Sequence, residues 1–201
     1  MRMVKKYGDY AAYLADQRAK TLAPETRARF ADRRAGRVTS FRRQFEHLLA
    51  GLPPALPAVC LGARYGEEVE ALRSLGHDAI GVDLVEHPPL VTEADFHALP
   101  FADGQFRLVY TNSVDHVLDW PRFAAEVRRV LARPAWLAVR LYFRDRDFGE
   151  RETLRLESVE EFCEAFPDFE TVRHRAGRGT ADLLLHLPGP TGQAGRPGGT
   201  P

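Results

Sequence analysis

One stretch limits the possible folds of this chain more than any other. It runs from Val59 to Val69 and is followed by a second segment, Ile80 to Leu84. Each segment starts with a short apolar run. The first run ends at Gly62, and a helical pattern begins at Gly66. The second run ends at Asp83. Glycine lets the backbone approach a ligand closely, and the free N–H groups of a helix start can bind an anion. Asp83 follows Gly62 by 21 residues, the distance at which a carboxylate on the next parallel strand binds a ribose diol. We predict a nucleoside-binding βαβ unit; the alternative is a glycine-capped turn with a solvated Asp83.

The first fifty residues predict two amphipathic helices. The first spans about 7–22 and the second runs from Pro24, a residue suited to a helix start, to about Leu49, with Gly36 as a candidate kink or break. Residues 1–50 carry a net charge of +7 (12 Lys and Arg against 5 Asp and Glu), and the remainder carries −7. Two interpretations stay open. In the first, the helices form a lid over a substrate pocket, and Tyr7, Tyr10 and Tyr13 either reach the sheet edge or pack in the core. In the second, their basic face binds nucleic acid.

From residue 58 the pattern alternates between strand and helix. Strands are predicted at 58–62, 79–83, 90–92, 106–111 and 136–143, and helices at 66–75, 114–118, 120–131 and 159–166, the last capped by Ser158. Segments 169–175 and 182–187 predict a closing antiparallel pair. This order predicts an α/β fold with a mostly parallel sheet between helices. The expected organisation is an N-terminal helical extension or lid (1–51), the α/β domain (52–187) and a disordered Gly/Pro tail (188–201).

Composition excludes several classes of protein. At 201 residues with 44% hydrophobic and 28% charged residues, the chain suits a single soluble domain with some additions. No apolar run approaches the ~18 residues of a membrane span, and the N-terminus lacks the apolar core of a secretory signal, so we expect the cytoplasm. Cys60 is expected to be a free core thiol, and no spacing of His, Cys or carboxylates predicts a metal.

Several motifs together resemble one enzyme family. Leu99-Pro100-Phe101 precedes Gly104-Gln105-Phe106, and Glu126 to Leu131 reads EVRRVL. With the glycine turn and Asp83, these segments resemble the class I S-adenosylmethionine-dependent methyltransferases, in particular the small-molecule methyltransferase type 11 group, over about residues 57–143. The resemblance implies a Rossmann-like seven-stranded sheet and S-adenosyl-L-methionine as cofactor. The cofactor residues that it implies are Gly62, Ala63, Arg64, Gly66, Asp83, Leu84, Asp95, Phe96, Asn112 and Ser113.

The sequence also departs from the family pattern. Cys60 replaces the acid that usually precedes the first motif glycine, and Arg64 replaces the second motif glycine. Arg107 stands where the family mostly has Asp, and Arg133-Pro134-Ala135 replaces a Pro-Gly-Gly turn. Losing the first acid removes one partner for the cofactor's ammonium group.

Candidate catalytic residues follow the strand 106–111 and end the strand 136–143. His116 is the candidate general base, because an imidazole with a pKa near ~6.5 accepts a proton at neutral pH; the alternative is a capping or packing role. Asp115 could orient His116, and Tyr142, followed by Arg144, could reach the substrate. His97 is expected either to contact the cofactor or to lie in solvent.

Three functions follow from these observations. The first is methyl transfer to O, N or C of a small molecule, with secondary metabolism as one setting. The second is a methyltransferase fold without methyl transfer, either a cyclase or isomerase or a binding protein, motivated by Cys60, Arg64 and the altered turn. The third is an RNA methyltransferase that uses the basic N-terminal segment. A homodimer through the N-terminal helices is a further expectation.

Overall fold

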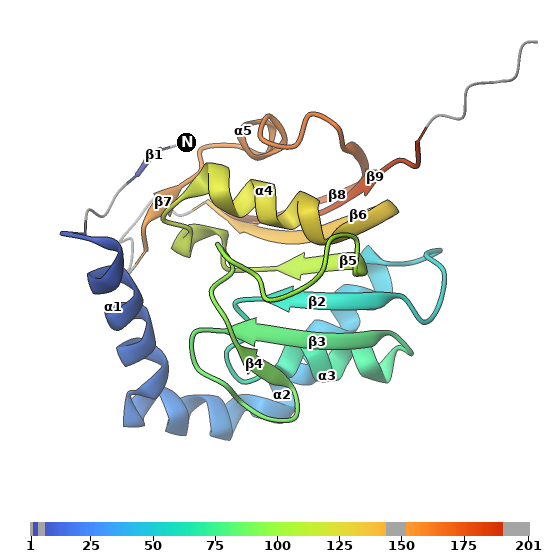
Figure 1. Ribbon diagram of the computed structural model, residues 1–201. Helices are drawn as coiled ribbons and strands as arrows, with labels where there is room; N and C mark the ends of the chain where they lie inside the picture. The colour runs from blue at the N-terminus through green and yellow to red at the C-terminus, as the bar shows by residue number, and fades with distance from the viewer. Residues whose placement is uncertain (1, 4–6, 144–151, 191–201) are drawn as a thin grey trace, which may run out of the picture.

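A single mixed sheet forms the centre of the molecule (Figure 1). The computed structural model describes residues 2–3, 7–143 and 152–190. The sheet order is β4-β3-β2-β5-β6-β9-β8, parallel from β4 to β6 and antiparallel at β9 and β8. The strands are β2 (Pro57–Leu61), β3 (Asp78–Asp83), β4 (Val91–Glu93), β5 (Phe106–Thr111), β6 (Leu131–Tyr142), β8 (Glu170–Gly177) and β9 (Thr180–Leu187). The predicted Rossmann-like α/β fold is confirmed.

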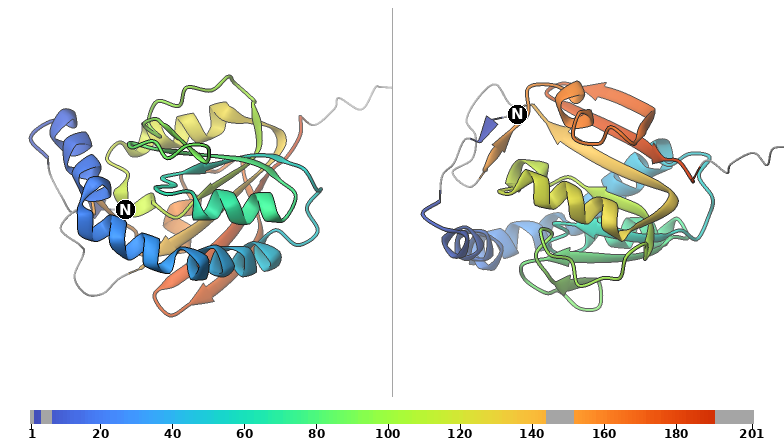
Figure 2. Two further views of the ribbon diagram at one scale, coloured as in Figure 1. Left: turned by 90° about the horizontal axis from the view of Figure 1, so that it is seen from below. Right: turned by 45° about the horizontal axis from the view of Figure 1, so that its top comes forward.

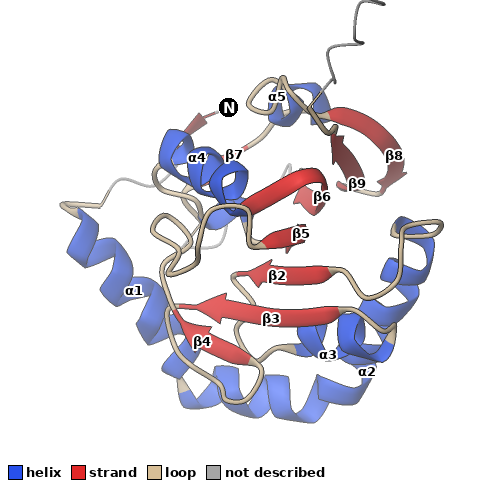
Figure 3. Cartoon of the chain, turned by 45° about the vertical axis from the view of Figure 1, so that its right-hand side comes forward, coloured by secondary structure: helices blue, strands red, loops and turns tan. Residues whose placement is uncertain are grey.

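Helices cover both faces of this sheet (Figure 3). Alternate residues of β2 enter two different cores: Val59 and Leu61 pack with α4 (Trp120–Val130), whereas Ala58 and Cys60 pack with α2 (Pro24–Leu48) and α3 (Glu67–Ser74). A short helix, α5 (Val159–Cys163), joins the α4 side. Burial on both faces explains why the central strands read as continuous apolar runs instead of alternating with polar residues.

The first helix, α1 (Tyr10–Leu22), lies across the carboxyl ends of the parallel strands, where Figure 2 shows it apart from the sheet faces. Two of the hydrogen bonds that hold its C-terminal half there involve backbone carbonyls. The Arg18 Nε donates to the Leu84 carbonyl at 3.1 Å, and the Tyr65 hydroxyl donates to the Thr21 carbonyl at 2.7 Å. Leu84 and Tyr65 both lie in loops at the carboxyl edge of the sheet. The helix α1 therefore covers the edge where α/β proteins bind their ligands.

Three local expectations are corrected by the structure. The helix expected at 114–118 is a single 3₁₀ turn, η1 (Val114–His116). The strand expected from residue 136 begins at Leu131, directly after α4, and a register shift against β5 accommodates Arg133 and Pro134 where a turn was expected. The helix α2 runs through Gly36 without interruption. The ends of helices fray and often take a 3₁₀ form, which is why the boundaries of elements are hard to predict from sequence.

Two further details concern the ends of elements. A two-residue strand, β1 (Arg2–Met3), pairs with β7 (Leu154–Arg155), a contact too short to leave a sequence pattern. Ser158 caps α5 as expected, with its hydroxyl accepting from the Glu161 N–H at 3.3 Å. Arg144 and residues 191–201 of the predicted tail lie outside the described residues.

Candidate functional site

The glycine turn after β2 has a conformation that its sequence alone does not reveal. Gly62 has φ +75° and Arg64, although not a glycine, has φ +45°. A Cβ at Gly62 would lie 2.5 Å from the Ser113 Oγ, so the absence of a side chain at Gly62 first of all makes room for the loop after β5. The Arg64 N–H donates to the Asp83 Oδ2 at 3.0 Å. The turn therefore brings the ends of β2, β3 and β5 together at one point.

Asp83 is a partly buried carboxyl at the tip of β3. Burial raises its pKa, although backbone N–H groups of Arg64, Leu84 and Val85 hydrogen-bond the carboxylate and offset part of the effect. These donors fix the orientation of the carboxylate. The predicted ribose-binding residue is thus held rigidly at the carboxyl end of the sheet.

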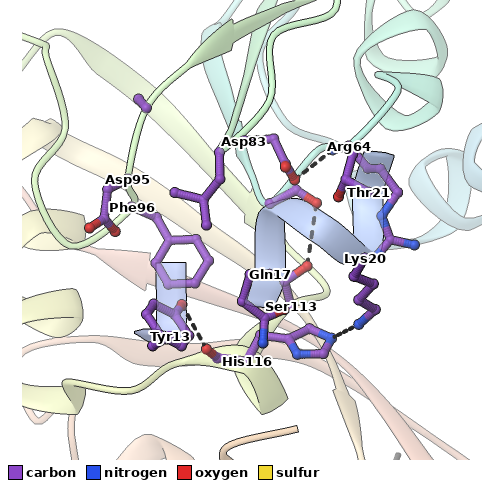
Figure 4. Close-up of a pocket in the computed structure, with 13 residues that line it drawn as sticks. Tyr13, Gln17, Lys20, Thr21, Arg64, Asp83, Asp95, Phe96, Ser113 and His116 are labelled. Atoms are coloured by element: carbon purple, nitrogen blue, oxygen red, sulfur yellow. Dashed lines mark hydrogen bonds between the residues drawn. The ribbon is translucent and has the colours of Figure 1, made fainter. Parts of the chain in front are cut away.

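A small cavity lies between this turn and α1 (Figure 4). Its volume is about 40 Å³, enough for ordered water and far below the ~300 Å³ of ordinary ligand pockets. The loops after the strands and α1 contribute its wall: Gly62, Arg64, Asp83, Leu84, Ala94, Asp95, Phe96, Ser113 and His116, with Tyr13, Gln17, Lys20 and Thr21 from α1. The side chains of α1 therefore fill space beside the predicted nucleoside residues.

Asp95 is the centre of a hydrogen-bonded cluster that reaches α1. Its carboxylate accepts from the Tyr10 hydroxyl and contacts the His97 Nδ1 at 2.8 Å. Burial by itself would raise the pKa of Asp95, but hydrogen bonds from His97 and Tyr10 outweigh burial and hold it below its ordinary value. The negative charge of Asp95 is therefore maintained at neutral pH, so the carboxylate can only accept hydrogen bonds.

His97 is a buried link in this cluster, 1% exposed. Its Nε2 accepts from the Asp119 backbone N–H at 3.2 Å, which places the proton on Nδ1, toward Asp95. His97 is absent from the walls of both cavities described in this section. The expectation that His97 lies in solvent is wrong; the ring positions Asp95.

A larger cavity of about 470 Å³ adjoins the small one. The two share Lys20, Gly62, Arg64, Ser113 and His116. Its remaining wall comes from α2, the turn after β2, α3, the loop after β5, β6 and the segment before β7: Arg29, Phe30, Arg37, Ser40, Phe41, Ala63, Glu68, Asn112, Asp115, Arg140, Tyr142 and Glu152. Its volume falls within the ordinary range of small-molecule sites.

His116 stands where the two cavities meet. The Lys20 Nζ lies 2.8 Å from its Nε2, and the Tyr13 hydroxyl donates to its carbonyl at 3.0 Å. An ammonium has donors only, so Nε2 is the acceptor in this contact and the proton of a neutral ring is on Nδ1. The helix α1 therefore contacts the candidate base through two residues (Figure 4).

The two remaining motifs join through one ion pair. The Leu99 N–H donates to the Glu126 Oε2 at 2.6 Å, and the Arg129 guanidinium donates to the carbonyls of Leu99 and Phe101 at 3.0 and 2.7 Å. The Arg129 hydrogen bond lowers the pKa of Glu126. The EVRRVL helix thus fixes the LPF turn, which supports the loop that carries Asp95.

Most residues predicted for the site lie at one place. Nine of the cofactor candidates line the two adjoining cavities, and His116, Asp115 and Tyr142 line the larger one. Gly66 does not: a Cβ there would meet the Leu90 side chain at 2.7 Å, so its role is close packing at the N-terminus of α3. Sequence reasoning missed Gln17, Lys20, Thr21 and Glu68, which no motif marks.

Comparison with protein families identifies the central part of this site. Residues 59–139, which include the glycine turn, Asp83, Asp95 and the loop after β5, match the family model described as "Methyltransferase domain". Residues 59–139, which are less than half of the chain, therefore form a methyltransferase domain. The resemblance stated from the motifs is confirmed, and with it the cofactor of the family. Comparison with curated protein sequences finds no significant match.

Solved structures share the methyltransferase fold at low sequence identity. The 1,6-didemethyltoxoflavin-N1-methyltransferase of Burkholderia thailandensis, solved with 1,6-didemethyltoxoflavin and S-adenosylhomocysteine, is 16% identical with a TM-score of 0.71, covering 92% of this chain and 94% of that one. An S-adenosylmethionine-dependent methyltransferase of Methanosarcina mazei is 15% identical (TM-score 0.57; 69% and 95% covered). The [4+2]-cyclase SpnF is 14% identical (TM-score 0.61; 76% and 81% covered).

The described residues contain no group of three or more His, Cys, Asp or Glu side chains arranged to hold a metal ion. None of the described helices has the length and apolar character needed to cross a bilayer.

Proposed function

We propose that this methyltransferase modifies a small molecule, with His116 as general base. The observation that carries the proposal is the pair of adjoining cavities, which share Gly62, Ser113 and His116. The smaller one lies against the nucleoside residues of the family, and the larger one opens beside the candidate base with the volume of a small-molecule site.

The residues of the small cavity match the chemistry of the cofactor's nucleoside. Asp83 offers a fixed carboxylate to the ribose hydroxyls, Asp95 an acceptor to the adenine amino group, and Leu84 and Phe96 apolar surfaces to the ring. The cavity of about 40 Å³ has room for none of these groups while α1 stays in place. We infer that the side chains of α1 move away when the cofactor binds.

The cofactor supplies a methyl group on a sulfonium, which leaves the protein to align the acceptor, exclude water and remove a proton. His116 can take that proton at Nε2 only after Lys20 leaves this nitrogen. The displacement of α1 that opens the nucleoside cavity would carry Lys20 away as well. Cofactor binding would then release the base, and Tyr142 and Asp115 would face the acceptor in the larger cavity.

Binding measurements with a variant at Asp83 test the cofactor assignment. Calorimetric titration with S-adenosylhomocysteine is expected to show micromolar binding by the wild type and no measurable binding by Asp83→Ala, because the ribose hydroxyls lose their acceptor. Asp78→Ala is the matched control, since Asp78 is exposed at the opposite end of the same strand. Undiminished binding by Asp83→Ala would refute the ribose contact.

The base assignment has its own test. With an acceptor found by screening, His116→Gln is expected to lower kcat by about 10²–10⁴-fold, the range for loss of a general base, with the affinity for S-adenosylhomocysteine little changed. An unchanged kcat would remove His116 from this role.

A cyclase or another reaction without methyl transfer is the second candidate. The fold shared with the cyclase SpnF and the departures at Cys60 and Arg64 favour it. Product mass distinguishes the two: methyl transfer adds a methyl group and yields one S-adenosylhomocysteine per product, whereas cyclisation leaves the mass and the cofactor unchanged.

The remaining expectations stay proposals. Arg18, Arg34 and Arg37 of the basic N-terminal segment pair with Glu93, Glu70 and Glu67. These pairs reduce the charge available to nucleic acid, so a small acceptor is favoured over RNA. RNA binding would require an affinity that falls steeply with salt. A cytoplasmic location and a homodimer are proposed on sequence grounds alone.

A further inference from the structure

Glu68 is a buried acid that the proposed function has not used. It lies in the first turn of α3, is 3% exposed, and lines the larger cavity beside Ala63 and Arg64. Burial raises its pKa to about 8. Its carboxyl accepts from its own backbone N–H, and no other hydrogen bond reaches the carboxyl from the part of the chain described. Burial outweighs the nearby charges of Arg37 and Arg64, and a buried acid held mostly neutral in this way is a candidate for ligand binding.

Glu68 lies near the position where this chain lacks the acid of the family motif. Cys60, at the end of β2, occupies the place of the usual acid and is fully buried. The charge of Glu68 contributes to raising the pKa of the Cys60 thiol, after burial itself, so the two side chains are neighbours. An acid is therefore present close to where the motif lacks one, but it comes from α3 and not from β2.

Arg64 is the second departure, and its backbone makes it unexpected. A φ of +45° is the left-handed region, where glycine is free of strain and an arginine is not. Its guanidinium carbon lies 4.8 Å from the centroid of the Phe30 ring, and its side chain contributes to both cavities. Figure 4 shows this side chain reaching from the turn toward Lys20 and Thr21. The side chain thus adds a positive charge beside the cofactor cavities at a backbone position that favours glycine.

We propose that Glu68 and Arg64 together bind the amino-acid end of the cofactor. In this arrangement the Glu68 carboxylate accepts from the ammonium and the Arg64 guanidinium holds the carboxylate. The inference rests on the proposed function, since it assumes that the cofactor occupies these cavities. It accounts for both departures from the family pattern together. Glu68 supplies the acid that residue 60 lacks, and Arg64 supplies a positive charge for the cofactor's carboxylate.

Two ligands separate this inference from the cofactor assignment. S-adenosylhomocysteine carries the amino-acid group, and 5′-methylthioadenosine has the same nucleoside without it. Calorimetry should show that Glu68→Gln and Arg64→Gly each weaken S-adenosylhomocysteine binding by about 10- to 100-fold, the cost of one hydrogen bond to a charged group. Binding of 5′-methylthioadenosine should stay unchanged. Arg64→Gly removes the guanidinium and suits the positive φ, so it tests the side chain without backbone strain.

The matched control is Glu70→Gln on the same helix. Glu70 is exposed, pairs with Arg34 at 2.7 Å, and is absent from the walls of the larger cavity. Unchanged S-adenosylhomocysteine affinity in Glu68→Gln and Arg64→Gly would overturn the inference, as would an equal loss of both ligands. Failure of the wild type to bind either ligand would instead refute the proposed cofactor site.

Proton exchange gives an independent readout. Titrations at about pH 7 in buffers of different ionisation enthalpy should show that the wild type releases close to one proton on binding S-adenosylhomocysteine, because the neutral Glu68 ionises next to an ammonium. Cys60, Tyr110, Arg37, Arg64 and Glu67 also face this carboxyl, so the comparison with Glu68→Gln isolates its contribution. Glu68→Gln should release none; equal release by both proteins would contradict the inference.

Discussion

At the scale of single residues, the site contains two acids held in opposite ways. Asp95 receives hydrogen bonds from His97 and Tyr10, which keep its pKa low despite burial. Glu68 receives no comparable support, and burial raises its pKa to about 8. Asp95 is thus ready to accept hydrogen bonds in the protein without ligand, whereas Glu68 is mostly neutral at pH 7 even with Arg37 and Arg64 nearby.

The pKa of Glu68 predicts how the stability of the ligand-free protein depends on pH. Its folded value of about 8 exceeds the ordinary 4.5, so the folded state binds more protons than the unfolded state between these values. The free energy of unfolding should therefore fall as pH rises from about 5 to about 8. Urea unfolding should show Glu68→Gln to be more stable than the wild type at about pH 8.5, with the difference shrinking toward pH 5. A difference that is independent of pH would contradict the shift.

Sequence analysis predicts those site residues that follow a strand in a recognisable motif. Asp83, Asp95 and Ser113 belong to this group, because the carboxyl ends of parallel strands meet at one edge. The proposed role of Glu68 depends on burial, which no local pattern shows, and the motif marks Arg64 without revealing its positive φ. The link from His97 to Asp119 joins two loops and is equally invisible in the sequence.

At the scale of elements, α1 is the part whose position most affects function. Amphipathic periodicity predicts this helix, but its docking depends on single hydrogen bonds to loops far along the chain: Tyr10 to Asp95, Tyr13 to His116 and Arg18 to Leu84. Such polar contacts between distant residues leave no period in the sequence. Of the residues that α1 contributes to the small cavity, the lid interpretation includes Tyr13, whereas Gln17, Lys20 and Thr21 have no sequence signal.

Removing one of these bonds should loosen α1. Tyr10→Phe deletes the hydroxyl that donates to Asp95, and hydrogen exchange of the amides in 10–22 should become about 5- to 10-fold faster, the effect of one net hydrogen bond. Tyr7→Phe is the control, because the Tyr7 hydroxyl donates to Asp16 within the same N-terminal segment. Equal exchange in Tyr10→Phe and the wild type would show that this bond does not hold α1 in place.

At the scale of the whole molecule, the sheet divides two cores and presents the site at its carboxyl edge. The order of strands and helices, and the closing hairpin of β8 and β9, follow from sequence because the principal elements have a clear hydrophobic pattern. The two-residue pairing of β1 with β7 and the direct passage from α4 into β6 do not, since they depend on tertiary contacts.

Cofactor binding at this edge should stabilise the whole fold. S-adenosylhomocysteine at about 100 times its Kd adds about 2.7 kcal/mol to the free energy of unfolding, which raises Tm by about 5–10 °C in a chain of this size. Differential scanning fluorimetry should show this rise in the wild type and in Asp78→Ala. The same rise in Asp83→Ala would contradict the assigned site.

The contact between Gly62 and Ser113 restricts how this enzyme can change. A Cβ at Gly62 would lie 2.7 Å from the Ser113 Cβ, so the Ser113 side chain fills the space beside Gly62. Substitutions at the two positions are therefore not independent: alanine at 62 would collide with the Ser113 side chain, and glycine at 113 would remove that collision. A directed-evolution library aimed at new acceptors should vary the two codons jointly, or hold both fixed and diversify Tyr142.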